Sequence, residues 1–261
     1  MSKIISIVNQ KGGVGKTTTA VNLAASLGLF RKKTLLIDAD SQGNATSGVG
    51  INKKSVKSTC YTMLSGDSTA EESIIQTEFE SLHIIPADDN LAVLDIEMAA
   101  IEAREFFMKN KLKNIKNEYD YIIIDCPPSV GVIIINALSA SDSVLIPSQC
   151  EFYSLEGISQ LSGVINRIKK NYNNLLEIEG ILLTMYDKRL KITIQVQEEL
   201  KKHFAEKVFS TVISRGVRLA EAPSHGKPAF YYSQCSKAAH DYLDLAEEIE
   251  AKNVLKSNQV I

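Results

Sequence analysis

The stretch Lys11-Gly12-Gly13-Val14-Gly15-Lys16-Thr17-Thr18 decides the fold of this 261-residue chain. It follows an apolar run at residues 4–8, which predicts a buried strand, and it opens a segment with helical spacing at residues 16–29. A glycine-rich loop between a strand and a helix is the context that a phosphate-binding loop requires. The sequence therefore predicts such a loop at residues 9–18.

Each residue type in this loop suits phosphate chemistry. Glycines let backbone N–H groups curl around phosphate oxygens, and the N-terminus of the following helix adds partial positive charge. Lys16 can reach the β- and γ-phosphates, and the Thr17 hydroxyl can bind Mg²⁺. We therefore expect residues 11–18 to bind a nucleoside triphosphate and Lys16 to take part in its cleavage.

The loop departs from the common pattern at its start. Gln10 stands where a glycine is usual, and Lys11 is an additional cation. Because Lys16 already serves the chain's own nucleotide, Lys11 could point outward and neutralise phosphate charge on a nucleotide held by a second copy, as an arginine finger does in trans. Spacing alone leaves open the alternative that Lys11 is a solvated loop residue.

The rest of the chain continues the alternation of strand and helix. Uniformly apolar runs, which predict strands covered on both faces, lie at residues 35–37, 84–85, 121–124, 144–146 and 181–185. Helical spacing marks residues 91–113, 155–168, 193–204 and 237–249. This order predicts an α/β fold of the P-loop NTPase type, with one mostly parallel sheet and helices on both faces. We expect a single domain at residues 1–252 and a disordered tail at residues 253–261.

Three aspartates follow two of the predicted strands. Asp38 and Asp40 come after one strand and Asp125 after another, and the carboxyl ends of parallel strands meet at one edge of a sheet. Mg²⁺ prefers oxygen ligands, so Asp125 is the candidate metal ligand, directly or through water. Asp40 could hold the attacking water, and Asp38 is assigned a structural role. Aspartates after strands also serve as turn or capping residues, which is the competing interpretation.

Composition narrows the class of protein. The chain has 29 Lys plus Arg against 31 Asp plus Glu, a formal net charge of −2, so binding to nucleic acid would need a local basic patch. Four cysteines without a CxxC pair indicate a reducing compartment. No secretory signal and no uncharged run of 18 residues is present in the sequence, and we expect a cytoplasmic protein without a membrane segment.

The phosphate loop resembles the deviant Walker A motif of the ParA/MinD class of ATPases. Residues 36–46, 121–129 and 217–226 are similar to the ParA (Soj) branch, which partitions chromosomes and plasmids. The resemblance implies ATP as the nucleotide, Asp40 as the residue that positions water, and an adenine site near Met185, Ser214 and Gly216. The absence of an Asn-Lys-x-Asp motif also favours ATP over GTP. This chain departs from the family at two of these positions, with Ser214 and Gly216 where the family commonly has Pro and Asn, so the resemblance does not fix the base contacts.

A local basic patch is also present in the sequence. Its residues cluster after the predicted strand at 181–185 and around the segment 217–226: Lys188, Arg189, Lys191, Arg215 and Arg218. Several cations acting together can bind DNA without sequence preference, and such binding weakens steeply with salt. The resemblance implies that Arg189 and Arg218 are the principal DNA-binding residues. The competing interpretation is a set of surface cations that only keep the protein soluble.

The resemblance implies a switch. ATP would close two copies into a sandwich dimer, the dimer would bind double-stranded DNA in the nucleoid, and a ParB-like centromere-binding partner would stimulate an otherwise weak hydrolysis. One alternative is a MinD-like membrane switch. The chain's end carries Glu247, Glu248 and Glu250 and lacks the basic amphipathic helix of that branch. The other alternative is a metabolic P-loop synthetase, which would need a second substrate pocket.

Overall fold

The computed structural model describes residues 2–151 and 154–258. Its centre is an eight-stranded sheet in the order β3-β4-β2-β5-β1-β6-β7-β8. All neighbouring strands are parallel except β3 and β4. The strands are β1 (Lys3–Ile7), β2 (Thr34–Asp38), β3 (Ile75–Gln76), β4 (Leu82–Ile85), β5 (Tyr121–Asp125), β6 (Ser143–Gln149), β7 (Glu177–Tyr186) and β8 (Val208–Ser214). The prediction of a mostly parallel α/β sheet is confirmed.

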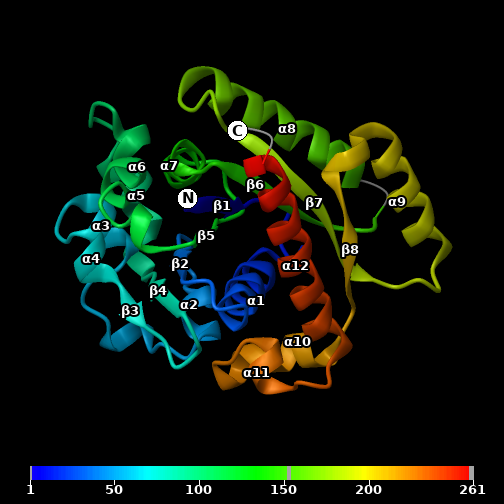
Figure 1. Ribbon diagram of the computed structural model, residues 1–261. Coiled ribbons are helices and arrows are strands. Elements are labelled where there is room, and N and C mark those ends of the chain that lie inside the picture. The colour runs from blue at the N-terminus through cyan, green and yellow to red at the C-terminus, as the bar shows by residue number, and fades with distance from the viewer. Residues whose placement is uncertain (1, 152–153, 259–261) are drawn as a thin grey trace.

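Helices cover both faces of this sheet. They are α1 (Lys16–Leu29), α2 (Asn44–Gly48), α3 (Cys60–Ser65), α4 (Ala70–Ser73), α5 (Leu94–Glu97), α6 (Phe107–Leu112), α7 (Val132–Ala140), α8 (Ser154–Asn171), α9 (Lys191–Phe204), α10 (Val217–Glu221), α11 (Ala229–Tyr232) and α12 (Lys237–Asn258). Figure 1 shows α1 and α12 on one side of the sheet and α6, α7 and α8 on the other. The covered faces explain why the strands are apolar throughout.

The strand β5 shows how one apolar run serves two cores. Ile122 and Ile124 lie in the core beneath α7 and α8, whereas Ile123 lies in the core beneath α1 and α12. Side chains alternate between the two faces of a strand, so a strand with a core on each face must be apolar at every position. All five residues of β5 are buried.

The prediction of one long helix at residues 91–113 is wrong. The segment forms a 3-10 helix at Asp89–Val93, the short helix α5, a second 3-10 helix at Arg104–Phe106, and α6. Ala103 has a φ of 56°, a left-handed conformation that ends helical continuity. The Arg104 side chain donates to the carbonyls of Met98 and Ala99 at 3.2 and 2.7 Å. Four apolar residues of this segment, Leu94, Met98, Met108 and Leu112, nevertheless all lie in one core.

Three other elements differ from expectation. The sequence did not predict the edge strand β8, whose outward residues are half-exposed, or α7, which is buried almost all round and so lacks a polar face. The helix α12 continues to Asn258 and therefore includes residues 253–258, which we expected in a tail. Residues 259–261 lie outside the described residues.

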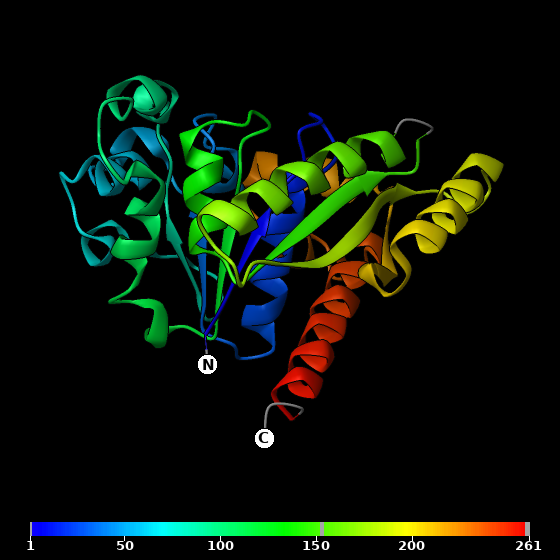
Figure 2. The ribbon, with the colours of Figure 1, turned by 90° about the horizontal axis from the view of Figure 1, so that it is seen from above.

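The sheet brings distant segments to one edge. Because β1 lies between β5 and β6, the loop after β1 is flanked by the ends of its neighbours. Figure 2 shows the start of β1 and the last described turn of α12 on one side, and the loop after β1 on the opposite side. The loop therefore lies at the carboxyl ends of the strands, where ligands bind in open parallel sheets.

Close packing of α1 makes Gly28 a test of the fold. A Cβ at Gly28 would lie 2.3 Å from the backbone oxygen of Glu80, so Gly28→Ala should lower the free energy of unfolding by about 1–3 kcal/mol. Gly163 in α8 is a matched control, since no described heavy atom lies within 4 Å of a Cβ there; Gly163→Ala should raise stability by about 0.5–1 kcal/mol. Urea unfolding without nucleotide measures both, and equal effects would contradict the described packing.

Candidate nucleotide-binding site

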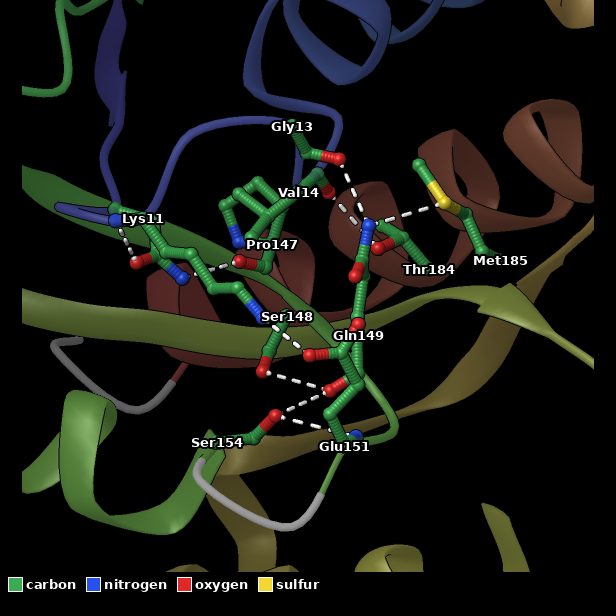
Figure 3. A network of polar contacts seen from close by, with 11 residues as sticks. Lys11, Gly13, Val14, Pro147, Ser148, Gln149, Glu151, Ser154, Thr184 and Met185 are labelled. Carbon is green, nitrogen blue, oxygen red and sulfur yellow. Dashed lines mark hydrogen bonds and ion pairs between the residues drawn. The ribbon is translucent and has the colours of Figure 1, made fainter.

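The loop between β1 and α1 is held by side chains from β6 and β7. Thr184 donates to the carbonyl of Val14 at 2.8 Å, and Gln149 Nε2 donates to the carbonyl of Gly13 at 2.8 Å (Figure 3). Gly13 and Gly15 have φ angles of 74° and 89°, in the left-handed region that favours glycine. The loop is therefore clamped from the side of the neighbouring strands, with the N-terminus of α1 at its end.

Asn9 fixes the start of the loop. Its Nδ2 donates to the carbonyl of Pro147 at 2.7 Å, and its Oδ1 accepts from the backbone N of Lys11 at 2.9 Å. One buried side chain thus ties the loop to β6 and orients Lys11. The sequence placed Asn9 at the edge of the motif without assigning it this role.

Lys16 is the first residue of α1, and its side chain points back to the preceding loop. Only 8% of the residue is exposed, and its Nζ donates to the carbonyl of Lys11 at 3.2 Å. Burial lowers the pKa of Lys16, while the charges of Asp125 and Asp40 act in the opposite direction. A buried cation beside a glycine loop and facing carboxylates is suited to bind the phosphate oxygens of a nucleotide whose metal ion the carboxylates hold.

Asp38 and Asp125 end neighbouring strands as direct partners in the sheet. Asp38 is fully satisfied: Thr46 donates to its Oδ2 from the backbone N and from Oγ1, both at 2.7 Å. Burial raises the pKa of Asp38 to about 6 against these hydrogen bonds. Asp38 thus attaches α2 to the sheet, which is the structural role expected for it.

Asp125 is different because its buried carboxylate lacks such hydrogen bonds within the described part of the chain. The residue is fully buried, and neither carboxylate oxygen has a hydrogen-bond partner of good geometry among the described residues, although the Thr17 hydroxyl is near enough to favour the ionised form. Burial, with the charge of Asp38, raises the pKa of Asp125 well above its ordinary value. An unpartnered buried carboxylate beside a threonine hydroxyl fits a divalent cation.

Asp40 stands at the open side of this group. It is partly exposed in the turn before α2, and its Oδ1 accepts from the backbone N of Gln42 at 3.0 Å. Its negative charge acts on both Lys16 and Asp125. The structure therefore brings Lys16, Thr17, Asp40 and Asp125 to one place, and their individual roles stay predictions.

Lys11 reaches across the loop toward the end of β6. Its Nζ forms an ion pair with Glu151, and both side chains are half-exposed (Figure 3). No role for Glu151 was predicted from the sequence. In the single chain, the Lys11 ammonium is thus paired with Glu151, while the Lys11 carbonyl accepts from Lys16.

The residues that we expected to surround the adenine base all line one cavity, which has a volume of about 260 Å³. Met185, Ser214 and Gly216 meet Gly15 and Thr18 there. Met185 has a φ of 51°, and its sulfur accepts from Gln149 Nε2 at 3.1 Å, so the same amide supports the phosphate loop and the cavity wall. The sequence missed the other lining residues: Thr184, Ile213, Arg215, Leu219, Ala220 and Tyr242.

A larger cavity of about 730 Å³ shares a wall with the first. Ser214, Arg215 and Gly216 line both. Lys188 and Arg189 line the larger cavity, which also has an apolar side formed by Val212 and Val217. Lys191 begins α9 and Arg218 lies on α10, outside that lining. Three residues of the predicted basic patch, Lys188, Arg189 and Arg215, therefore line a cavity that borders the candidate base site.

Comparison with known proteins agrees with this geometry. The chain matches the family described as "AAA domain" over residues 2–178. It is 54% identical to the sporulation initiation inhibitor protein Soj of Bacillus subtilis over 96% of this chain and 99% of that protein. It is 48% identical to the chromosome partitioning protein ParA of Myxococcus xanthus over 98% of this chain and 91% of that protein.

The chain belongs to the ParA/Soj family. The resemblance found in the sequence is thereby confirmed. A ParA/Soj fold is also shared more widely: the structure of cobyrinic acid a,c-diamide synthase from Mycobacterium smegmatis with bound ADP and magnesium superposes with a TM-score of 0.83. That protein is 29% identical, and the match covers 95% of this chain and 93% of that one. Within the described part of this ParA/Soj chain, none of the helices has the length and apolar character needed to cross a membrane.

The buried carboxylate of Asp125 predicts that the fold gives up stability for binding. Asp125→Asn removes a buried carboxyl group whose ionised form burial disfavours and which lacks hydrogen-bond partners among the described residues, so the nucleotide-free protein should become more stable by about 1–3 kcal/mol. The same change should abolish any increase in melting temperature that Mg²⁺ adds to that of ATP alone. Thermal unfolding with and without ATP, with either Mg²⁺ or EDTA, measures both effects. Asp38→Asn is the matched control and should destabilise, because Asp38 accepts the hydrogen bonds of Thr46. A less stable Asp125→Asn protein that still responds to Mg²⁺ would contradict the assignment.

Proposed function

We propose that the protein is a DNA-partitioning ATPase. In this proposal, ATP and Mg²⁺ join two copies into a dimer, the dimer binds double-stranded DNA without sequence preference, and hydrolysis releases it. A ParB-like centromere-binding partner would accelerate a weak intrinsic hydrolysis, and DNA binding would place the cytoplasmic protein on the nucleoid. The observation that carries the proposal is the 54% identity to Soj along nearly the whole chain.

The residues present suit ATP and Mg²⁺. The backbone of residues 12–16 would surround the phosphates, Lys16 would contact the terminal ones, and Thr17 with Asp125 would hold the cation. The adenine would enter the cavity between Met185 and Ser214. ATP with its magnesium supplies the phosphoryl group that is transferred to water. The magnesium and ADP named for the cobyrinic acid a,c-diamide synthase structure support this choice of ligands.

Hydrolysis would depend on how the chain places water and charge. Asp40, at the open side of the site, would hold and orient the attacking water, while Lys16 would stabilise negative charge on the phosphates. Hydrolysis by a single chain would be weak because its own Lys11 is paired with Glu151.

The dimer would complete the site. Lys11 lies at the mouth of the loop, and no described heavy atom lies within 4 Å of the position a Cβ would take at Gly12. A second chain could therefore approach the loop closely there, and each Lys11 would leave Glu151 to neutralise phosphate charge in the other subunit. ATP would then act as a ligand shared by two chains.

The basic patch would bind DNA when two copies lie together. Arg189 and Lys188 at the large cavity, with Arg215, Lys191 and Arg218 nearby, would be doubled in a dimer and so contact more phosphates. The wall formed by Ser214, Arg215 and Gly216 lies between the base cavity and this patch. The proposed base site and the proposed DNA surface would therefore be direct neighbours in one chain.

The two alternatives have less support. A MinD-like membrane switch needs a free amphipathic helix at the C-terminus, but α12 packs on β8, where Glu248 accepts from the backbone N of Ser210 and Thr211 at 3.0 and 2.9 Å. A metabolic synthetase shares the fold at 29% identity, well below the identity to Soj. Liposome binding or turnover of a carboxylate metabolite would favour one of these alternatives over partitioning.

Gly12→Val tests the close approach of two chains. The variant should bind ATP with an affinity within about threefold of wild type, because its side chain meets open space in its own subunit. Overpacking at the contact should weaken the ATP-dependent dimer at least about tenfold. Fluorescent ATP binding and analytical ultracentrifugation measure the two, with Gly12→Ala as the graded control. A Gly12→Val dimer as stable as wild type would rule out this interface.

Arg189→Ala tests the DNA surface. The ATP-dependent dimer should persist, while DNA affinity falls about tenfold and the slope of log K against log salt becomes shallower by about one to two. Arg167→Ala, an exposed arginine on α8, is the matched control for loss of one cation. Fluorescence anisotropy with a random-sequence duplex measures the affinities. Unchanged DNA binding in Arg189→Ala, or equal loss in the control, would remove this patch from the proposal.

A further inference from the structure

The two arginines expected to contact DNA are both bound to acids of their own chain. Arg189 makes two parallel hydrogen bonds to Asp187, from Nε to Oδ1 at 2.9 Å and from Nη2 to Oδ2 at 2.7 Å. The backbone N of Arg189 also donates to Oδ1 at 3.0 Å. This two-point geometry is the one that arginine forms with phosphate as well as with carboxylate.

A second pair, with a single hydrogen bond between arginine and carboxylate, lies on α10. Arg218 Nη1 donates to Glu221 Oε2 at 2.6 Å, and the Tyr232 hydroxyl donates to the same oxygen at 3.2 Å. The hydrogen bond and charge of Arg218 lower the pKa of Glu221, and those of Arg189 lower the pKa of Asp187 to about 2. Both acids are therefore ionised throughout the physiological pH range.

The pairing is selective within the patch. Lys188, Lys191 and Arg215 have no ion-pair partner among the described residues, whereas Arg189 and Arg218 do. The two acids reduce the formal charge of the five cations from +5 to +3. Exposed ion pairs of this kind contribute only about 0–1 kcal/mol to folding, so stability of the fold does not explain them.

DNA phosphate and these carboxylates compete for the same donors. An arginine that turns to a phosphate loses its hydrogen bonds to the acid, and the acid left nearby repels the phosphate. Two like charges about 5 Å apart in water change an equilibrium about fourfold. Each acid should therefore weaken DNA binding at its own arginine by about that factor.

We propose that Asp187 and Glu221 are affinity-setting residues that compete with DNA for Arg189 and Arg218 and keep DNA binding weak enough to be reversed. This inference rests on the proposed DNA-binding function. Its consequence is that the bare chain presents a partly neutralised patch, and that DNA binding requires both arginines to exchange a carboxylate for a phosphate.

Asp187→Asn is the direct test, because asparagine keeps an oxygen for the backbone N of Arg189 and removes only the charge. With ATP and Mg²⁺, affinity for a random-sequence duplex should rise about four- to tenfold, and the slope of log K against log salt should become steeper by about one. Glu221→Gln should act in the same direction, and the two effects should multiply in the double variant. Dimer mass is measured in the same samples, so that affinities are compared at equal amounts of dimer.

Glu199→Gln is the matched control, since Glu199 pairs with Lys202 at 2.5 Å on the last turns of α9, away from the patch. It adds the same charge to the protein, and its DNA affinity should stay within about twofold of wild type. Weaker binding by Asp187→Asn would show that Asp187 orients Arg189 for DNA, and equal tightening by Glu199→Gln would show an effect of net charge; either result overturns the inference. If wild type binds no duplex with ATP and Mg²⁺, the proposed function itself fails.

Discussion

The site depends on a buried carboxylate that the described chain leaves without hydrogen-bond partners. Asp125 ends the strand beside β1 in full burial, next to Asp38 and facing Lys16 and Thr17. Hydrogen bonds from Thr46 stabilise Asp38, but Asp125 has no such support from the residues that the structure describes. The arrangement is unfavourable without a cation and favourable with one, so a magnesium nucleotide would stabilise the folded chain at the very residues that bind it.

Asp38 and α2 connect these buried carboxylates to the protein's surface. Asp38 holds α2, and the loop after α2 touches the turn that follows α10: a Cβ at Gly226 would lie 2.7 Å from the Cα of Gly50. The turn carries Pro223 and follows Glu221 and Arg218 on α10. A displacement of the Asp40 segment would therefore reach the basic patch through direct backbone contact. The competition of Asp187 and Glu221 with DNA would let small changes of this kind alter DNA affinity.

Local signals in the sequence predicted the elements that they determine directly. The glycine loop and the helix at residues 16–29 agree with the structure residue for residue, because the motif requires both. The long helix at 91–113 failed because nothing in its spacing shows the left-handed turn at Ala103. Gln149 and Thr184 clamp the phosphate loop, yet single polar residues at strand ends carry no pattern; only the order of strands reveals that they meet Gly13 and Val14. The acids that bind Arg189 and Arg218 lie only two and three residues away in the sequence, but they were missed because the geometry of the turn or helix decides which side chains pair.

The central claim is that Lys11 serves the triphosphate of a second chain. Light scattering of Asp40→Ala with saturating ATP and Mg²⁺, beside the double variant Lys11→Ala/Asp40→Ala, tests it most directly. The account predicts twice the 28.7 kDa mass of one chain for Asp40→Ala and a single-chain mass for the double variant. A single-chain mass for Asp40→Ala, or a dimer that forms equally well without Lys11, would contradict it.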